Sequence, residues 1–258
     1  TTDTDTTAAG FQQTDSCMGY PQLHKFYVND NSQTGDIFTT ATGSDNNRGD
    51  ATAPFATLSH ALSMAVQGDT IYIDAGTYNE DVEINKSLNI SGAFDQTIIK
   101  GLYSGNEATV LISSDSILIK DLTITRDFGS DLSSWQNCTK DKGVRLAEGT
   151  KDIRIKNVKV TGNKKGIYIN NSQNISLKDC IIEDNYTGLQ FEKNVSGAEV
   201  HNNFIRNNYT NGVLFNFDQE AGLITNNVHV NNNSISGNWY SQVNFQHNNN
   251  LIPEGDHS

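Results

Sequence analysis

The chain has 258 residues, of which 35% are hydrophobic, and it carries a net charge of −12 with an isoelectric point near 4.8. This acidic balance argues against nucleic acid and anionic membrane surfaces as partners. No apolar run approaches the about 20 residues of a membrane helix, so no membrane insertion is expected. The composition is too polar for a large two-layer core, but it suits the thin continuous core of a repeat protein.

Four segments are predicted along the chain. They are a tail or linker at 1–24, a strand, loop and helix at 25–68, a coil of strands at 69–250 and a second tail at 251–258. The first segment is rich in Thr and Asp, which is typical of a tail that buries little apolar surface.

A helix is predicted over 54–66, "PFATLSHALSMAV". Phe55, Leu58 and Leu62 fall on one helical face, and Pro54 suits the first turn of a helix. We expect this helix to cap the strand coil, because the first turn would otherwise expose its core and its strand edge to water.

The second half of the chain repeats a short unit that opens with glycine. The units begin "GVRL" at Gly143, "GIYI" at Gly166, "GLQF" at Gly188 and "GVLF" at Gly212, steps of 22 to 24 residues. Apolar and polar residues alternate within the strands of each unit. Period-two alternation inside this longer period indicates that each strand pairs with its equivalent one turn later. The predicted fold class is therefore all-β, a parallel β-helix solenoid.

Two columns of turn residues repeat with the same period. They are Asn163, Asn185 and Asn208, and, six residues earlier in each unit, Asn157, Asp179 and Asn202. An amide tolerates the left-handed backbone of a tight turn, and stacked amides can hydrogen-bond to their copies above and below. We expect both columns to form structural ladders. After residue 226 the register is open, because Asn233 and Asn238 both fit.

On these residues the chain resembles the right-handed parallel β-helices of the pectin-lyase type. The segment "GIYINNSQNISLKDCIIEDNYTGLQF" is similar to the carbohydrate-binding and sugar-hydrolase repeats, a group that includes the periplasmic copper-processing β-helix proteins. The segment from "YVNDN" to "NEDVEI" resembles the opening of many secreted β-helix proteins, some of them polysaccharide lyases. The resemblance covers about residues 25–250 and implies the fold, whereas this fold carries many activities.

Catalytic chemistry has two candidate groups of outward-facing residues. Glycoside hydrolysis requires two carboxyl groups around the bond, and no column pairs outward Asp or Glu on neighbouring turns. A uronan lyase or epimerase requires a cation beside the carboxylate and a base at the α-proton. Lys156, Lys178 and His201 form one basic column, and Arg145 with Tyr168 forms a second pair. The alternative interpretation is that these are solvated strand residues that discourage edge pairing.

The segment "RDFGSDLSSWQNCTKDK" at 126–142 interrupts the regular turns. Insertions of this kind often carry binding on a solenoid. Trp135 can stack on a sugar ring, and Asp127 or Asp131 can accept sugar hydroxyl groups; the alternative is that Trp135 folds back over the core. We therefore predict carbohydrate contact on this flank.

No metal centre is predicted from spacing. The loop "TGSDNNRGD" at 42–50 has closely spaced oxygen ligands but lacks the closing Glu of an EF-hand, so calcium stays only an alternative. Cys17, Cys138 and Cys180 are too scattered for a zinc site or a disulfide framework, and Cys180 is expected in the core.

The sequence favours a secreted or cell-surface module, with the periplasm as an alternative location. It is expected to be non-catalytic, to act in adhesion or carbohydrate binding with a polysaccharide or glycan partner, and to form part of a larger surface protein. The competing interpretation is a polysaccharide lyase or epimerase that acts on uronic-acid polymers.

Overall fold

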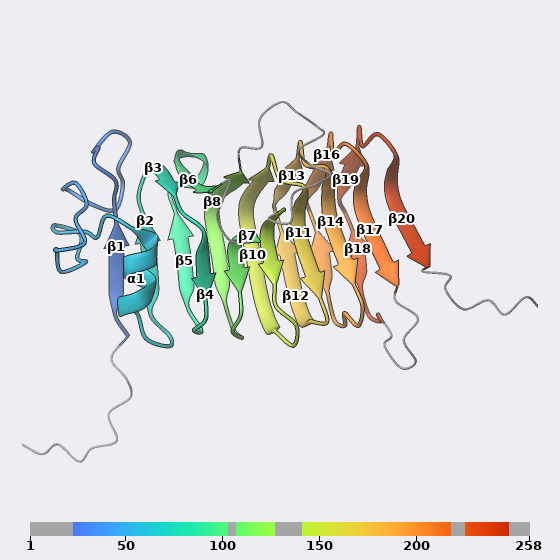
Figure 1. Cartoon of the computed structure of the whole chain (residues 1–258), viewed down its shortest axis with the longest axis horizontal. Helices are drawn as coiled ribbons and strands as arrows, with labels where there is room; N and C mark the ends of the chain where they lie inside the picture. Colours follow the sequence, from blue (N-terminus) through green and yellow to red (C-terminus); the bar gives the residue numbers. More distant parts are fainter. Residues whose placement is uncertain (1–22, 103–106, 127–140, 218–224, 248–258) are drawn as a thin grey trace, which may run out of the picture.

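The computed structural model describes residues 23–102, 107–126, 141–217 and 225–247. The chain coils into a stack of short strands that runs from the N-terminal to the C-terminal end (Figure 1). None of the helices in these ranges is long and apolar enough to cross a membrane. The elements are β1 Lys25–Val28, α1 Leu58–Met64, β2 Thr70–Ile73, β3 Gly76–Asn79, β4 Val82–Ile84, β5 Asn89–Gly92, η1 Phe94–Gln96, β6 Thr97–Gly101, β7 Ala108–Ile112, β8 Leu118–Arg126, β9 Lys142–Leu146, β10 Lys151–Thr161, β11 Lys165–Asn170, β12 Gln173–Lys178, β13 Ile181–Glu183, β14 Thr187–Glu192, β15 Glu199–His201, β16 Phe204–Arg206, β17 Asn211–Phe217, β18 His229–Asn231, β19 Ser234–Ser236 and β20 Ser241–His247.

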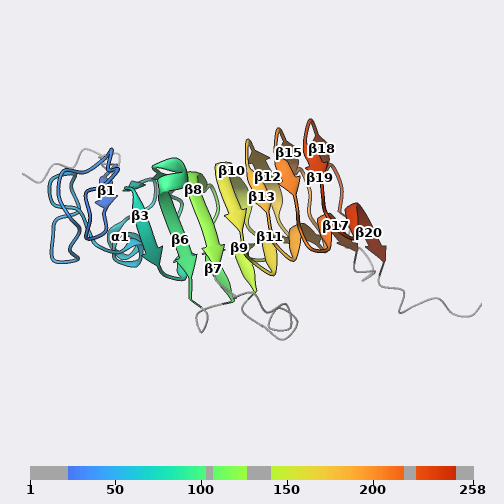
Figure 2. The same ribbon diagram turned by 90° about the horizontal axis from the view of Figure 1, so that it is seen from above.

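The strands form two sheets whose pairings are all parallel. The 7-stranded sheet has the order β20-β17-β14-β11-β9-β7-β4, and the 13-stranded sheet contains the path β1-β2-β5-β8-β10-β12-β15-β18. Neighbours in each sheet come from successive turns, as Ile167↔Leu189 and Leu189↔Val213 illustrate. Figure 2 shows the same stack from above. The predicted all-β parallel β-helix is therefore confirmed.

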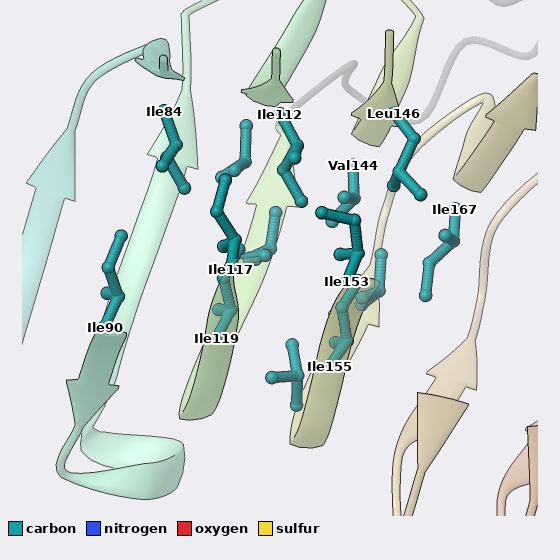
Figure 3. Packing of buried hydrophobic residues seen from close by; sticks show 14 of the residues in the cluster. Ile84, Ile90, Ile112, Ile117, Ile119, Val144, Leu146, Ile153, Ile155 and Ile167 are labelled. Atoms are coloured by element: carbon teal, nitrogen blue, oxygen red, sulfur yellow. The ribbon is translucent and has the colours of Figure 1, made fainter. Parts of the chain in front are cut away.

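The core is a continuous column of aliphatic and aromatic side chains between the sheets. Ile84, Ile112 and Leu146 stack from turn to turn on one side, and Ile119 and Ile155 do so on the other (Figure 3). Each is at most 1% exposed, so alternate residues of each strand point inward as the period-two pattern predicts. Cys180 lies in this column and is also buried. Because every turn repeats the pattern, the outward positions form equally regular columns.

The N-terminal helix is shorter than predicted. It spans Leu58–Met64, because the Thr57 hydroxyl caps it by accepting from the backbone N–H of His60. The residues before it continue the first strand layer, where Phe55 bridges to Val28. The predicted apolar face is nevertheless buried: Phe55, Leu58 and Leu62 are 1%, 0% and 8% exposed.

We expect Leu58→Ala to lower the free energy of unfolding by about 2–5 kcal/mol, because it leaves a cavity between the helix and the first turn. The matched control is Met64→Ala on the same helix, where the side chain is 53% exposed. Thermal melting followed by circular dichroism measures both. A Leu58→Ala variant that melts with the Met64→Ala variant would show that the helix does not stabilise the stack.

One asparagine column forms a hydrogen-bonded ladder. Asn163 Nδ2 donates to Asn185 Oδ1 at 3.0 Å, and Asn185 Nδ2 donates to Asn208 Oδ1 at 3.1 Å. Asn208 Nδ2 donates in turn to Asn238 Oδ1 at 2.8 Å, so Asn238 continues this column. All four side chains are at most 4% exposed. The ladder closes the turns that precede β11, β14, β17 and β20 of the 7-stranded sheet.

The second column agrees with the prediction at Asn157, whose Nδ2 donates to Asp121 Oδ1 one turn earlier at 2.7 Å, and differs from it by one residue on the later turns. Asn157, Asp179 and Asn202 have left-handed backbones, with φ of 54°, 57° and 58°, and they form the bend itself. The inward-pointing position is the next one, where Asn203 accepts from the backbone N–H of Cys180 at 2.8 Å and donates to Asn233 Oδ1 at 2.9 Å. Within the described residues Asp179 and Asn202 share no side-chain hydrogen bond, because the bend turns their side chains away from the core.

Candidate functional site

The outer face of the 7-stranded sheet carries a group of buried and half-buried polar side chains. Arg145 of β9, Tyr168 of β11 and Gln190 of β14 are paired in register on consecutive turns. Lys142 and Lys165 form the parallel column at the start of the same strands. The inward neighbours of these residues hold the strands on the core, so the outward side chains stand on a rigid surface. We call this group, Lys142, Arg145, Lys165, Tyr168 and Gln190, the β9–β14 face.

Tyr168 lies at the centre of the β9–β14 face. The Nζ atoms of Lys142 and Lys165 lie 5.2 and 4.8 Å from the centre of its ring. Burial, followed by the charge of Glu192, raises the pKa of the Tyr168 hydroxyl to about 12. The phenol is therefore neutral at physiological pH and can donate one hydrogen bond as well as accept.

The cations of this face differ in their partners. Lys142 Nζ lies 2.8 Å from Asp141 Oδ1, and Arg145 forms an ion pair with Glu107. Within the described ranges no carboxylate lies at ion-pair distance from Lys165. Burial lowers the pKa of Lys165, and the charges of Lys142 and Lys164 lower it further, against the opposing effect of Asp141 and Glu192. Lys165 is thus the cation of this face that is left for an external anion.

Three polar atoms of this surface are shielded from water yet have no hydrogen-bond partner in the described part of the chain. They are Arg145 Nε, Asn170 Oδ1 and Asn216 Oδ1. The other atoms of the same amides are used: Asn170 Nδ2 donates to Glu148, and Asn216 Nδ2 donates to Glu192, at 2.8 and 2.7 Å. A buried polar atom without a partner costs free energy, and because these three atoms are shielded they are closed to a ligand as well as to water.

The two predicted catalytic groups lie on different sheets. Arg145 and Tyr168 belong to the β9–β14 face, whereas Lys156, Lys178 and His201 stand in register on β10, β12 and β15 of the 13-stranded sheet. Beside this basic column is an open groove of about 430 Å³, lined by Ser116, Asp152, Arg154, Asn174, Ile175, Ser176, Gly197 and Glu199. The structure therefore does not combine the two groups into one site.

The predicted sugar-binding residues Trp135, Asp127 and Asp131 lie outside the described residues. Their segment starts after Arg126, which ends β8, and it finishes before Lys142, which begins β9. The segment is therefore connected directly to the first strand of the β9–β14 face.

The acidic residues of the loop at 42–50 are used within the fold. Asp45 accepts hydrogen bonds from the backbone of Ala56 and Thr57 beside the helix start, and Asp50 accepts from Thr52 and Ala53. In the described parts of the chain, no cluster of three or more His, Cys, Asp or Glu side chains is arranged to hold a metal ion.

Sequence reasoning missed Lys142 and Lys165 as site residues. Both immediately precede an opening glycine, at Gly143 and Gly166, and this shared position was the signal that could have placed them in one column. It also missed Asn170 and Asn216. These two asparagines share a column, but Glu192 occupies the turn between them, so the sequence shows no repeated asparagine there.

Comparison with known proteins identifies the family. The model of the right-handed β-helix region family matches residues 88–256, and the chain therefore belongs to this family. The protein YwoF of Bacillus subtilis (strain 168) is 28% identical over 209 residues, which is 70% of this chain and 43% of that protein. The chain thus spans less than half the length of this relative.

Solved structures share the fold at low sequence identity. Pectate lyase Pel9A is similar over 80% of this chain and 58% of its own, with 13% identity and a TM-score of 0.55. The GH136 lacto-N-biosidase from Eubacterium ramulus matches 76% of this chain and 45% of its own, with the same identity and TM-score. The match to the Dettilon tailspike protein covers 77% of this chain and 43% of the tailspike chain, with 13% identity and a TM-score of 0.52. These likenesses confirm the right-handed parallel β-helix fold.

Proposed function

We propose that this right-handed β-helix chain is a non-catalytic carbohydrate-binding module whose glycan contact lies on the β9–β14 face. The observation that carries the proposal is Tyr168 in register with Arg145 and Gln190, with the Nζ atoms of Lys142 and Lys165 5.2 and 4.8 Å from its ring centre. Sugar hydroxyl groups both donate and accept hydrogen bonds, so they complement a neutral phenol that can do both beside two ammonium donors. A flat, rigid sheet holds these groups in place without a closed pocket, which suits an extended polymer.

The same face favours a glycan that contains carboxylate sugars. Lys165 is half-buried and without a carboxylate partner in the described ranges, so an external carboxylate would gain a charge-assisted hydrogen bond there. The names of two structural neighbours, a pectate lyase and a tailspike, are in keeping with carbohydrate as the ligand class. We infer an extracellular or cell-surface location, a role in adhesion to polysaccharide, and a place within a larger surface protein.

The first test measures binding of polygalacturonate and alginate, with neutral xyloglucan for comparison, by isothermal titration calorimetry. We expect Lys165→Met to weaken binding of the acidic glycans about 10-fold or more, because it removes a charged hydrogen-bond donor. The matched control is Lys156→Met, an exposed lysine of the 13-stranded sheet. If Lys156→Met weakens binding and Lys165→Met does not, the glycan contact lies on the other sheet.

The segment between β8 and β9 remains part of the proposal. Trp135→Ala is expected to weaken the same binding without a change in melting temperature, because its segment joins the β9–β14 face at Lys142. Asp127 and Asp131 are proposed to accept hydroxyl groups of the same glycan.

A lyase or epimerase acting on uronic-acid polymers is the second candidate, and the lowered pKa of Lys165 favours it. In its neutral form the Lys165 amine would take the proton α to the uronate carboxylate, and Arg145 would offset the developing charge. The C–O bond to the next sugar would then break to leave a C=C bond, as the neutral Tyr168 hydroxyl gives its proton to the leaving oxygen. Because the active form is deprotonated, the rate should rise with pH through a midpoint below the ordinary lysine pKa of 10.5. Absorbance of unsaturated uronate that grows with time in the parent chain, and is lost in Lys165→Met, would establish this activity in place of simple binding.

A further inference from the structure

A strip of aromatic side chains follows the asparagine ladder along the edge of the 7-stranded sheet. Tyr186, Tyr209 and Trp239 each come directly after a ladder asparagine, and they occupy the same place on three successive turns. Their backbone N–H groups donate to the turn before, from Tyr186 to Asn163 at 2.9 Å and from Tyr209 to Asn185 at 2.8 Å. The strip is therefore fixed by the same ladder that closes the turns.

The rings touch one another along the strip. The ring centres of Tyr186 and Tyr209 are 5.4 Å apart, and those of Tyr209 and Trp239 are 5.2 Å apart. Tyr186 and Tyr209 are nearly parallel, at 29°, but the Trp239 ring is tilted by 57° from Tyr209. Trp239 is 77% exposed and the adjacent Tyr240 is 75% exposed. Large exposed aromatic side chains that gather at one place usually mark an interaction site.

The aromatic strip continues the column that borders the β9–β14 face. Lys164 occupies the position of Tyr186 on the turn before. The backbone N–H of Thr187, the residue after Tyr186, donates to the Lys164 carbonyl. Lys165 and Thr187, the next residues of the two turns, are paired in register. An occupant of the β9–β14 face that extends toward the C-terminal end of the stack therefore reaches Tyr186, Tyr209 and Trp239 in that order.

We propose that the strip of Tyr186, Tyr209, Trp239 and Tyr240 is an extension of the glycan site, so that a uronic-acid polymer runs along the stack from Lys165 to Trp239. This proposal rests on the proposed function. Successive turns advance by about 4.8 Å, a spacing comparable to the advance per sugar in an extended chain. The polymer would therefore meet one side chain of the strip per sugar.

The side chains of the strip suit a sugar polymer in two ways. Tyr186 and Tyr209 cover each other's faces and can offer ring edges and hydroxyl groups, whereas the exposed Trp239 and Tyr240 can offer ring faces on which a sugar stacks. The Thr187 and Thr210 hydroxyl groups, 3.0 Å apart, lie beside the strip and add polar partners. A protein partner would require a broader surface, because stable protein interfaces bury about 800 Å² on each side, and the strip is only one or two residues wide.

The experiment compares oligogalacturonates and oligoalginates of three and ten units by calorimetry. At one sugar per turn, a trimer that starts at Lys165 ends at Tyr209, one turn short of Trp239, whereas a decamer spans the whole strip. We expect the decamer to bind the parent chain more tightly than the trimer, and Trp239→Ala to reduce decamer affinity about 2- to 10-fold while leaving trimer affinity unchanged. Phe204→Ala is the matched control, since Phe204 is 50% exposed on β16 of the other sheet.

A fluorescence experiment reports on the strip directly. The decamer should shift the tryptophan emission of the parent chain further than the trimer does, and this additional shift should be absent in Trp239→Phe, which keeps Trp135. Unchanged decamer affinity in Trp239→Ala overturns the extension and, if Lys165→Met still weakens trimer binding, leaves the proposed function standing. Failure of both lengths to bind the parent chain overturns both. A change of oligomeric state in Trp239→Ala, seen by light scattering without a change in glycan affinity, would show that the strip is a contact between copies.

Discussion

Asn185→Ala is expected to lower the free energy of unfolding by roughly 2–5 kcal/mol, because at least two donors lose their acceptor and each such loss costs about 1–3 kcal/mol. Asn185 Oδ1 accepts from both the backbone N–H and the Nδ2 of Asn163, at 3.0 Å each. Its own Nδ2 donates to the carbonyls of Val160 and Glu183 and to Asn208 Oδ1. The side chain is 1% exposed, so water cannot replace these partners.

The measurement is the thermal unfolding midpoint of purified protein, with Asn85→Ala as the control for an exposed asparagine. Asn170→Ala is a poor control, although the sequence places Asn170 at a looser turn. Its side chain is 5% exposed and donates to Glu148, so that variant also removes a partner. Equal midpoints for Asn185→Ala and Asn85→Ala would contradict the role of the ladder in stability.

The fold could be predicted from the sequence because each turn repeats the same alternation of apolar and polar residues. The inward positions of Val144, Ile167, Leu189 and Val213 follow from a period of two within a longer period, and the structure buries all four. The bend of the second ladder was less readable, since an asparagine suits both a left-handed backbone and an inward amide. Asn202 and Asn203 are adjacent, and only the geometry of the bend decides that Asn203 points inward.

The candidate site was less predictable than the core because it depends on burial rather than on pattern. Arg145 and Tyr168 were identified as a pair from their common column, and the register places them side by side. That Lys165 is half-buried without a carboxylate partner, while Lys142 is held by Asp141, depends on which acidic side chains reach across the turns. The sequence shows which residues share an outward column, but it does not show which carboxylate pairs with which lysine.

Arg126 was interpreted from the sequence as the start of a surface insertion, but the structure makes it one of the most buried side chains, at 1% exposed. Its Nη2 lies 2.7 Å from Asp81 Oδ1, its Nη1 donates to the Leu102 carbonyl at 2.7 Å, and its Nε donates to the Thr109 hydroxyl at 3.2 Å. The guanidinium therefore ties the end of β8 to segments that precede it by up to 45 residues.

Arg126→Met is expected to lower the free energy of unfolding by about 3–5 kcal/mol, because it breaks the buried ion pair with Asp81 by removing one partner. The double variant Arg126→Met/Asp81→Leu removes both charges and should recover part of this loss. Recovery should be incomplete, since the backbone N–H of Leu102 also donates to Asp81, at 3.2 Å, and would lose its acceptor. Melting midpoints of the parent, single and double variants measure the two effects. A single variant as stable as the parent would mean that the pair contributes no stability. A double variant less stable than the single one would mean that the bond from the Leu102 N–H to Asp81 outweighs the removal of the charge.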